Sequence, residues 1–203
     1  MTRGLFVAFE GIDASGKSTQ ARRVAALAEA LFTFEPGDTP LGAELRRWLL
    51  DASTPMSPET EALLMLADRS HHVSSVIEPA LVSGRHVVSD RFAASTIAYQ
   101  GFGRGLDVRQ LLDTTELAIG QCRPDLTILC DVDVEVAYAR RHPDSADRFE
   151  SSARDFHERV REGFLEQARS HPDNWVIVDA HGDLESVTEQ VNGYLRKVGW
   201  PGL

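Results

Sequence analysis

The chain has 203 residues, of which 42% are hydrophobic and 26% charged, and its formal net charge is −10. This length suits an α/β domain with its own core, and we predict a single domain over residues 1–203. No run of 18 uncharged apolar residues occurs, so we expect no membrane-spanning helix. The acidic balance argues against nucleic acid as a partner, because such binding needs a basic face.

Cysteine use and the N-terminal residues predict a cytoplasmic protein. The sequence contains two cysteines, Cys122 and Cys130, and neither has metal-ligand spacing to a histidine. The first residues carry neither the apolar core nor the cleavage site of a signal peptide. A reducing compartment fits both observations.

Strand and helix patterns alternate from the first residues onward. The apolar run 5–9 predicts a buried strand, which a glycine-rich turn connects to a helix over about 16–30. Residues 31–34 predict a short second strand, and a loop follows over 35–40. Ser57, Pro58 and Glu59 form a helix start, with a serine cap, a proline at the first position and acid in the first turn.

The alternation continues to the C-terminus. We expect the helix that starts at Pro58 to run to about residue 82, and a buried strand at 86–89. Further helices are expected near 93–100, 108–120, 133–141, 151–170 and 184–198, with strands at 126–130 and 175–178. The fold class is therefore α/β, in three α/β/α layers, with helices on both faces of a five-stranded parallel sheet.

The strongest motif is Gly11-Ile12-Asp13-Ala14-Ser15-Gly16-Lys17-Ser18, which fits the phosphate-binding pattern G-x-x-x-x-G-K-[ST] between a strand and a helix. Its glycines let backbone N–H groups point at phosphate oxygens, and the helix N-terminus adds partial positive charge. We expect ATP as cofactor, with Lys17 on the β- and γ-phosphates and Ser18 on Mg²⁺. The predicted ATP-binding residues here are Gly11, Asp13, Ala14, Ser15, Gly16, Lys17, Ser18 and Thr19. The alternative is a chance match in a structural turn.

Asp90 and Arg91 follow the strand at 86–89. Ligands of open parallel sheets bind at this end of the strands, so Asp90 is a candidate for Mg²⁺ and Arg91 for phosphate. The alternative for Asp90 is a helix cap for the segment that starts at Phe92.

Arginines also flank a polar segment at 142–147. Transfer between two phosphates needs cations around the migrating group. We therefore predict a lid over about 141–150 that brings Arg140, Arg141 and Arg148 to the phosphates. Arg140 and Arg141 are assigned to ATP binding and Arg148 to catalysis. The alternative is a solvated basic patch.

Seven motifs in order resemble the thymidylate kinase family over nearly the whole chain. They are Phe9-Glu10-Gly11-Ile12-Asp13, Glu35-Pro36-Gly37 with Thr39-Pro40-Leu41-Gly42, Ala67-Asp68-Arg69, Asp90-Arg91-Phe92, Ser95-Thr96-Ile97-Ala98-Tyr99-Gln100-Gly101, Pro124-Asp125-Leu126 and Asp147-Arg148-Phe149-Glu150. The resemblance implies a P-loop NTPase fold and the reaction ATP + dTMP giving ADP + dTDP. Ala14 stands where some members carry an arginine, which resembles the bacterial type with lid arginines.

The resemblance also implies roles for single residues. Asp13 would face the acceptor's sugar hydroxyl, Arg69 the thymine edge, and Arg91 the acceptor phosphate. The predicted acceptor-binding residues are Asp13, Glu35, Pro36, Met65, Arg69, Arg91, Ser95, Thr96, Tyr99 and Gln100. With Lys17, Asp90 and Arg148, Arg91 forms the predicted catalytic set, and Ser18 and Asp90 are the metal ligands. The family further implies a homodimer, for which the apolar face of the helix at 58–82 is a candidate: Leu63, Leu64, Leu66, Val73 and Ile77. The same face could equally be core.

Three departures from the family pattern bear on the acceptor. Phe34 stands where the family places an arginine, Met65 where it places a base-stacking phenylalanine, and the stretch before Glu35 is several residues short. Two alternatives therefore stay open: another nucleoside or nucleoside-monophosphate kinase, and a nucleotide-binding protein without catalytic activity.

Overall fold

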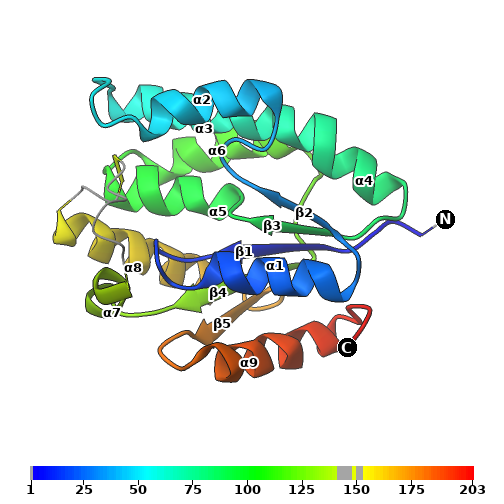
Figure 1. Ribbon diagram of the computed structural model, residues 1–203. Coiled ribbons are helices and arrows are strands. Elements are labelled where there is room, and N and C mark those ends of the chain that lie inside the picture. The colour runs from blue at the N-terminus through cyan, green and yellow to red at the C-terminus, as the bar shows by residue number, and fades with distance from the viewer. Residues whose placement is uncertain (1, 141–147, 150–152) are drawn as a thin grey trace.

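Five parallel strands form one sheet in the order β2-β3-β1-β4-β5 (Figure 1). The computed structural model describes residues 2–140, 148–149 and 153–203. The strands are β1 (Phe6–Glu10), β2 (Leu31–Phe34), β3 (Val87–Asp90), β4 (Leu126–Asp131) and β5 (Trp175–Asp179). The predicted parallel five-stranded sheet is confirmed.

Helices cover both faces of this sheet. They are α1 (Lys17–Leu27), α2 (Pro40–Leu50), α3 (Pro58–His72), α4 (Glu78–Val82), α5 (Ala93–Thr96), α6 (Val108–Ile119), α7 (Val134–Arg140), α8 (Arg154–Ser170) and α9 (Leu184–Lys197), with two π-helical segments, η1 (Val73–Ile77) and η2 (Ile97–Gly103). None of the helices in the described ranges is long and apolar enough to cross a membrane.

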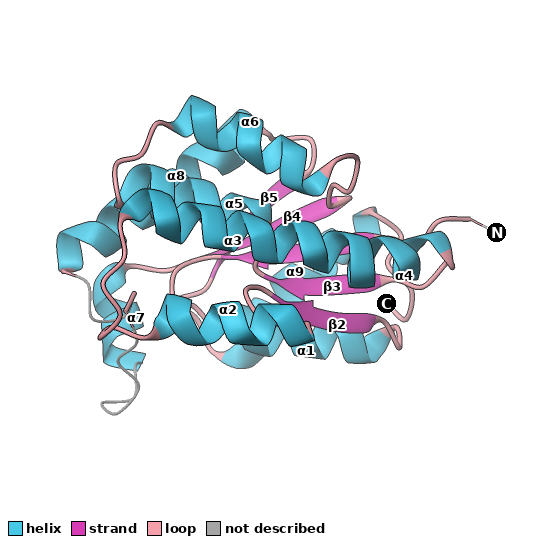
Figure 2. Cartoon of the chain, turned by 90° about the horizontal axis from the view of Figure 1, so that it is seen from above, coloured by secondary structure: helices cyan, strands magenta, loops and turns pink. Residues whose placement is uncertain are grey.

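The central strand β1 shows how the three layers form. Its side chains alternate, so that Phe9 packs in one cluster with Val24 of α1, while Phe6 packs in another with Ile77 of η1. Helix α9 lies beside α1, where Arg23 forms an ion pair with Glu185 at 3.0 Å. Figure 2 shows the sheet between α1 and the layer that contains α3, α4 and α8. The predicted α/β/α arrangement is therefore confirmed.

The short second strand is complete. β2 pairs with β3 along its whole length, from Leu31 opposite Val87 to Phe34 opposite Asp90. Helix α1 ends at Leu27, three residues earlier than expected, and the chain turns back through Glu29 in a left-handed conformation (φ 48°). The few residues before Glu35 are thus enough to reach the sheet.

Helix α2 was not predicted from the sequence. The loop expected over 35–40 ends at a helix start, where the Thr39 hydroxyl accepts a hydrogen bond from the Gly42 N–H at 2.8 Å and Pro40 occupies the first position. This is the same cap-proline signal that identified the start of α3 at Ser57 and Pro58.

The other helices follow the prediction with local changes. The helix expected over 58–82 is continuous, but it widens into η1 in the middle. The helix expected near 93–100 extends through η2 to Gly103. Residues 151–152 lie outside the described part, and α8 begins at Arg154. The predicted polar segment at 142–147 also lies outside the described residues.

Candidate functional site

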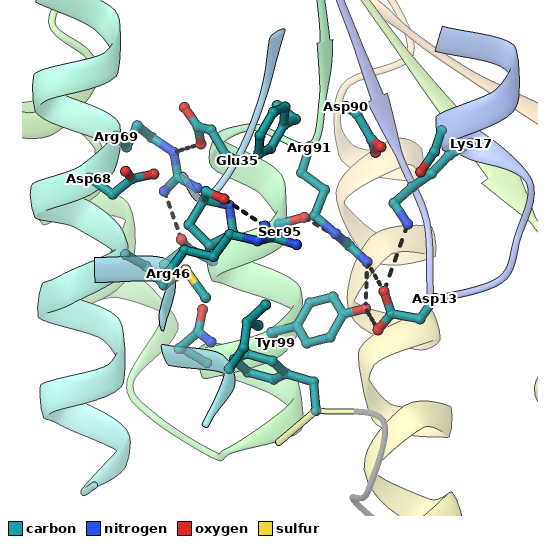
Figure 3. Close-up of a pocket in the computed structure, with 18 of the residues that line it drawn as sticks. Asp13, Lys17, Glu35, Arg46, Asp68, Arg69, Asp90, Arg91, Ser95 and Tyr99 are labelled. Atoms are coloured by element: carbon teal, nitrogen blue, oxygen red, sulfur yellow. Dashed lines mark hydrogen bonds and ion pairs between the residues drawn. The ribbon is translucent and has the colours of Figure 1, made fainter. Parts of the chain in front are cut away.

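A cavity of about 410 Å³ lies where β1, β2 and β3 end (Figure 3). Most of the sequence-predicted site residues line it: Asp13, Lys17, Ser18, Glu35, Pro36, Met65, Arg69, Asp90, Arg91, Ser95, Thr96, Tyr99 and Gln100. Among the described lining residues, five are basic and four acidic, although the chain as a whole is strongly acidic. The cavity can thus accommodate an anion within an acidic protein.

The phosphate loop joins β1 to α1 at one end of the cavity. Its backbone takes left-handed conformations at Ala14 (φ 63°) and Gly16 (φ 88°). At Gly11 a side chain is excluded, because a Cβ atom would lie 2.6 Å from the Cys130 carbonyl oxygen. The Ser15 hydroxyl is buried and has no hydrogen-bond partner among the described residues. The loop therefore has the curled backbone that turns N–H groups toward an anion.

Lys17 is buried at the start of α1, and its ammonium is loosely held. Its Nζ lies 3.5 Å from the Ile12 carbonyl oxygen and 3.8 Å from Asp13 Oδ1. Burial, together with the nearby charge of Arg91, lowers the pKa of Lys17. A phosphate would give this ammonium the close negative partner that the protein supplies only at a distance.

Arg91 is fixed in the middle of the cavity. Its guanidinium donates to Asp13 Oδ1 at 2.5 Å, to the Tyr99 hydroxyl at 2.9 Å and to the Ser95 hydroxyl at 3.0 Å. Burial opposes the charge, but the oxygens of Tyr99 and Asp13 outweigh it and raise the pKa of Arg91. The backbone of Arg91 is left-handed (φ 72°), a strained conformation for a non-glycine residue that is typical of functional sites.

Glu10, at the end of β1, positions Arg91 through contacts with the residues that follow it. Its carboxylate accepts hydrogen bonds from the backbone N–H of Phe92 at 2.9 Å and from the Ser95 hydroxyl at 2.6 Å. The side chain is fully buried, and this burial raises the pKa of Glu10 to about 7. Glu10 thereby fixes the start of α5 and, through Ser95, the position of Arg91.

Asp90 lies near Lys17 in the cavity (Figure 3), and Ser18, the next residue in the chain after Lys17, also lines it. The Asp90 Oδ1 atom is buried without a hydrogen-bond partner among the described residues. This carboxylate oxygen and the hydroxyl of Ser18, which lines the same cavity, are suitable ligands for Mg²⁺, which takes few protein ligands and completes its shell with water and phosphate oxygens.

At the other end of the cavity a buried arginine is held in a network. Arg69 is 2% exposed and donates to Glu35 Oε2 at 2.8 Å, to the Thr96 hydroxyl at 2.7 Å and to the Phe92 carbonyl at 2.9 Å. Glu35 also contacts His72 Nδ1 at 2.9 Å. Burial alone would raise the pKa of Glu35, but Arg69 and His72 lower it. These contacts use three of the five guanidinium N–H groups, so donors remain for a ligand.

The comparisons with known proteins agree on one family. The family model for thymidylate kinase matches residues 9–191. The chain belongs to the thymidylate kinase family. It is 44% identical to the thymidylate kinase of Symbiobacterium thermophilum, over 96% of this chain and 94% of that protein, and 49% identical to that of Desulforudis audaxviator, over 87% and 83%. The crystal structure of thymidylate kinase from Ehrlichia chaffeensis matches with a TM-score of 0.79 at 32% identity, covering 96% and 99% of the two chains.

As a member of the thymidylate kinase family, the chain is an enzyme with the P-loop fold that phosphorylates dTMP to dTDP. The predicted family, fold and activity are confirmed. The relatives named here are all thymidylate kinases, so the comparisons favour neither another acceptor nor a protein without catalytic activity.

Two departures from the thymidylate kinase pattern have a structural counterpart. Phe34 occupies the position of the family arginine, and the guanidinium of Arg46 lies over its ring at 5.6 Å while donating to the Pro36 carbonyl at 2.6 Å. Arg46 comes from α2 and lines the cavity. The cavity therefore has a positive charge next to Phe34, although Phe34 itself is uncharged. Met65 also lines the cavity, as expected for a residue that replaces a stacking ring.

Some predicted residues lie away from the cavity. Arg140 donates to the carbonyl oxygens of Ala180 and His181, at 2.9 and 3.1 Å. Arg148 donates to the carbonyl oxygen of Leu49 in the last turn of α2 and to those of Asp51 and Thr54, which follow the helix. Thr19 is exposed on α1. Arg141 lies outside the described residues, and so does most of the predicted lid, so the role of the lid stays a prediction.

Sequence reasoning assigned no role to three residues that shape the site. Arg46 was missed because no element was predicted for the residues after 40, where α2 lies. Glu10 was recognised as part of a motif, but a strand residue gives no sign of which backbone groups it will meet. Asp68 accepts from the Gly37 N–H at 3.2 Å, and burial, with the charge of Glu35, raises its pKa to about 6. The sequence did contain a signal for Asp68, because it directly precedes the predicted site residue Arg69.

Proposed function

We propose that dTMP and the terminal phosphates of ATP meet in this one cavity, with the base of dTMP at Arg69 and the phosphates between Arg91 and Lys17. The observation that carries the proposal is the continuity of the cavity, which joins the phosphate loop to the buried arginine network. One guanidinium, Arg91, lies between the two ends (Figure 3). A phosphate donor and an acceptor bound at these ends would place their charges on the same cation.

The base would lie against Met65 and present its edge to polar side chains. Arg69 would donate to the O4 oxygen of thymine, and Gln100 would face N3. Thr96 and Glu35 hold Arg69 in place, while Pro36 and Tyr99 would shape the pocket around the sugar. Asp13 would accept a hydrogen bond from the sugar hydroxyl in addition to its bond from Arg91.

The acceptor phosphate would bind Arg46 and Arg91. Figure 3 shows Arg46 reaching toward Arg91 from the opposite wall of the cavity. Two guanidinium groups supply the parallel N–H donors that match phosphate geometry. Arg46 would thus take the part that the family pattern gives to the arginine at position 34.

Catalysis would depend on positioning and on positive charge, and no covalent intermediate is needed. Lys17 and Arg91 would stabilise the charge that spreads over the migrating phosphoryl group, with the loop N–H groups fixing its oxygens. Ser18 and Asp90 would hold Mg²⁺, which would supply additional positive charge for the transfer. For Arg148 to act on this group, its guanidinium would have to leave the carbonyl oxygens of Leu49, Asp51 and Thr54.

The proposed assembly is a cytoplasmic homodimer. Of the candidate face on the long helix, Leu66, Val73 and Ile77 are buried core residues, whereas Leu63 is 62% exposed. Helix α6, which contacts α3, exposes Leu112 and Leu117. A second copy would cover such leucines, and light scattering on the purified protein measures the mass that decides between monomer and dimer.

A substrate panel tests the acceptor. Labelled ATP is supplied with dTMP, dUMP, dCMP, dGMP or thymidine, and kcat/KM is measured for each. We expect dTMP to be the best substrate, with dUMP next because it shares the N3 and O4 groups. A preference for dCMP, dGMP or thymidine would contradict the assignment of the base end of the cavity.

A further inference from the structure

Glu61 does not line the cavity, yet its carboxylate is buried directly behind Gln100. The Glu61 side chain is 3% exposed and lies in the first turn of α3. Its Oε1 atom accepts a hydrogen bond from Gln100 Nε2 at 2.9 Å. Gln100 itself is 1% exposed and lies in the π-helical segment η2.

Arg104 fixes the other side of the same carboxylate. Its guanidinium donates to Glu61 Oε1 at 3.2 Å and to Oε2 at 3.0 Å. The guanidinium also lies over the rings of Phe156, at 4.7 Å, and Phe149, at 5.7 Å. Paired with the Arg104 cation through both oxygens, the Glu61 carboxylate acts toward its neighbours as a hydrogen-bond acceptor.

An acceptor-only partner determines which way the Gln100 amide faces. The NH₂ group must point at Glu61, because the amide oxygen would otherwise meet a carboxylate oxygen with no proton between them. The amide oxygen is consequently the polar group that Gln100 offers to the cavity. No donor from the described residues occupies it.

The direction of this oxygen matters for the choice of base. Thymine and uracil carry a proton at N3, whereas cytosine carries a lone pair there and an amino group at C4. If the amide oxygen of Gln100 faces the cavity, it accepts a hydrogen bond from N3–H of thymine or uracil, and it repels the N3 lone pair of cytosine. We propose that Glu61, held by Arg104, is a positioning residue that makes the pocket select 4-oxo over 4-amino pyrimidines. This inference rests on the proposed function, in which Gln100 faces N3 of the base.

Glu61→Gln is the sharpest test, because it keeps the shape and changes the hydrogen-bond pattern. The new amide would accept from Arg104 with its oxygen and donate to Gln100 with its nitrogen. Gln100 would then turn its own NH₂ group inward, toward a base that carries an acceptor at N3. We expect the ratio of kcat/KM for dTMP over dCMP to fall at least tenfold. The change should lie mainly in KM for the pyrimidine nucleotide, with KM for ATP within twofold of wild type.

Two variants control for loss of structure. Glu61→Asp keeps an acceptor-only group, so its discrimination ratio should stay near that of wild type even where its activity is lower. Glu116→Gln makes the same atomic change in a surface carboxylate that pairs with Arg123, and it should leave the ratio unchanged. A folded Glu61→Gln protein with the wild-type ratio would overturn the proposal, as would an equal loss of discrimination in Glu61→Asp.

The wild-type protein offers a second measurement that needs no Glu61 variant. The side-chain NH₂ signals of Gln100, assigned by their loss in Gln100→Met, should exchange slowly with water both with and without dTMP, because they face buried Glu61. Fast exchange that slows when dTMP is added would place them in the cavity and overturn the proposal. A preference of the wild type for dCMP, dGMP or thymidine would instead contradict the proposed function, so the two failures are distinguishable.

Discussion

At the scale of single residues, Glu10 connects the end of β1 to the arginine in the middle of the site. Its two oxygens accept three hydrogen bonds, from the N–H groups of Phe92 and Ser95 and from the Ser95 hydroxyl. Ser95 in turn accepts from Arg91. A buried carboxyl with these contacts affects both the stability of the fold and the geometry of Arg91.

The raised pKa of Glu10 predicts a pH dependence of stability. Burial raises its pKa from 4.5 to about 7, so between these values the folded state holds a proton that the unfolded state has lost. The contribution of Glu10 to stability is fully present below about pH 4.5 and is lost as the pH rises through 7. Relative to Glu10→Gln, the wild type should lose roughly 2 to 3 kcal/mol of unfolding free energy between pH 5 and pH 8. Urea unfolding of both proteins across this range measures the difference, and parallel pH curves would contradict it.

Arg46 gives a prediction about the acceptor phosphate. Its replacement in Arg46→Ala removes charged hydrogen bonds worth about 1.5 to 3 kcal/mol, so KM for dTMP should rise roughly 10- to 100-fold. KM for ATP should change little, because Lys17 and the loop bind that nucleotide. The matched control is Arg47→Ala, which removes an exposed arginine next to it that pairs with Glu44. Steady-state kinetics, with each substrate varied in turn, measures both KM values for the two variants. An equal rise of KM for dTMP in Arg46→Ala and Arg47→Ala would contradict the role of Arg46.

At the scale of elements, η2 and α8 are packed closely enough to leave no room for a methyl group. A Cβ atom at Gly163 of α8 would lie 2.7 Å from the Phe102 ring, and one at Gly103 would lie 2.6 Å from the Phe156 ring. This contact supports the segment that carries Tyr99 and Gln100. Two glycines, each beside a ring from the other element, therefore keep part of the pocket wall in place.

Gly163→Ala should destabilise the protein by about 1 to 3 kcal/mol, because the ring and the helix must move apart. KM for dTMP should rise with it, since η2 carries base-pocket residues. The control is Gly193→Ala in α9, where a Cβ atom meets nothing within 4 Å and alanine should add up to about 1 kcal/mol through its helix propensity. Thermal unfolding measures the stability of the two variants relative to wild type. A Gly163→Ala protein more stable than wild type would contradict the prediction, because the ring and the helix would then have room for the methyl group.

The elements also show where sequence reasoning ends. Apolar runs, caps and the phosphate motif identified all five strands and most helices, because these signals are local. Helix α2 was missed although Thr39 and Pro40 carry the same signal as Ser57 and Pro58. The contacts of Glu10 and Glu61 join residues 82 and 39 positions apart, and no local pattern predicts such pairs.

At the scale of the whole molecule, a strongly acidic chain concentrates basic side chains in one cavity. The lining includes five basic residues: Lys17 and Arg22 of α1, Arg46 of α2, Arg69 of α3, and Arg91 after β3. These segments come together only in the fold. Both nucleotides are anions, so the cavity attracts them while the remaining surface stays acidic.

A shared cavity predicts that a single ligand can fill both ends. An analogue that links adenosine to thymidine through a polyphosphate should raise the melting temperature more than saturating dTMP or ADP alone. A ligand that binds only the folded state stabilises it by about 2.7 kcal/mol at a hundredfold excess over its Kd. The melting temperature with each ligand is the measurement, and an analogue that stabilises no more than dTMP would indicate separate sites.

The most direct test of the central claim is the transfer of label from γ-labelled ATP to dTMP by the wild type and by Lys17→Ala in one assay. The account predicts labelled dTDP from the wild type and a rate at least about 100-fold lower from the folded variant, because the cation at the migrating phosphate is gone. Equal rates in the two proteins, or release of labelled phosphate without labelled dTDP, would contradict it.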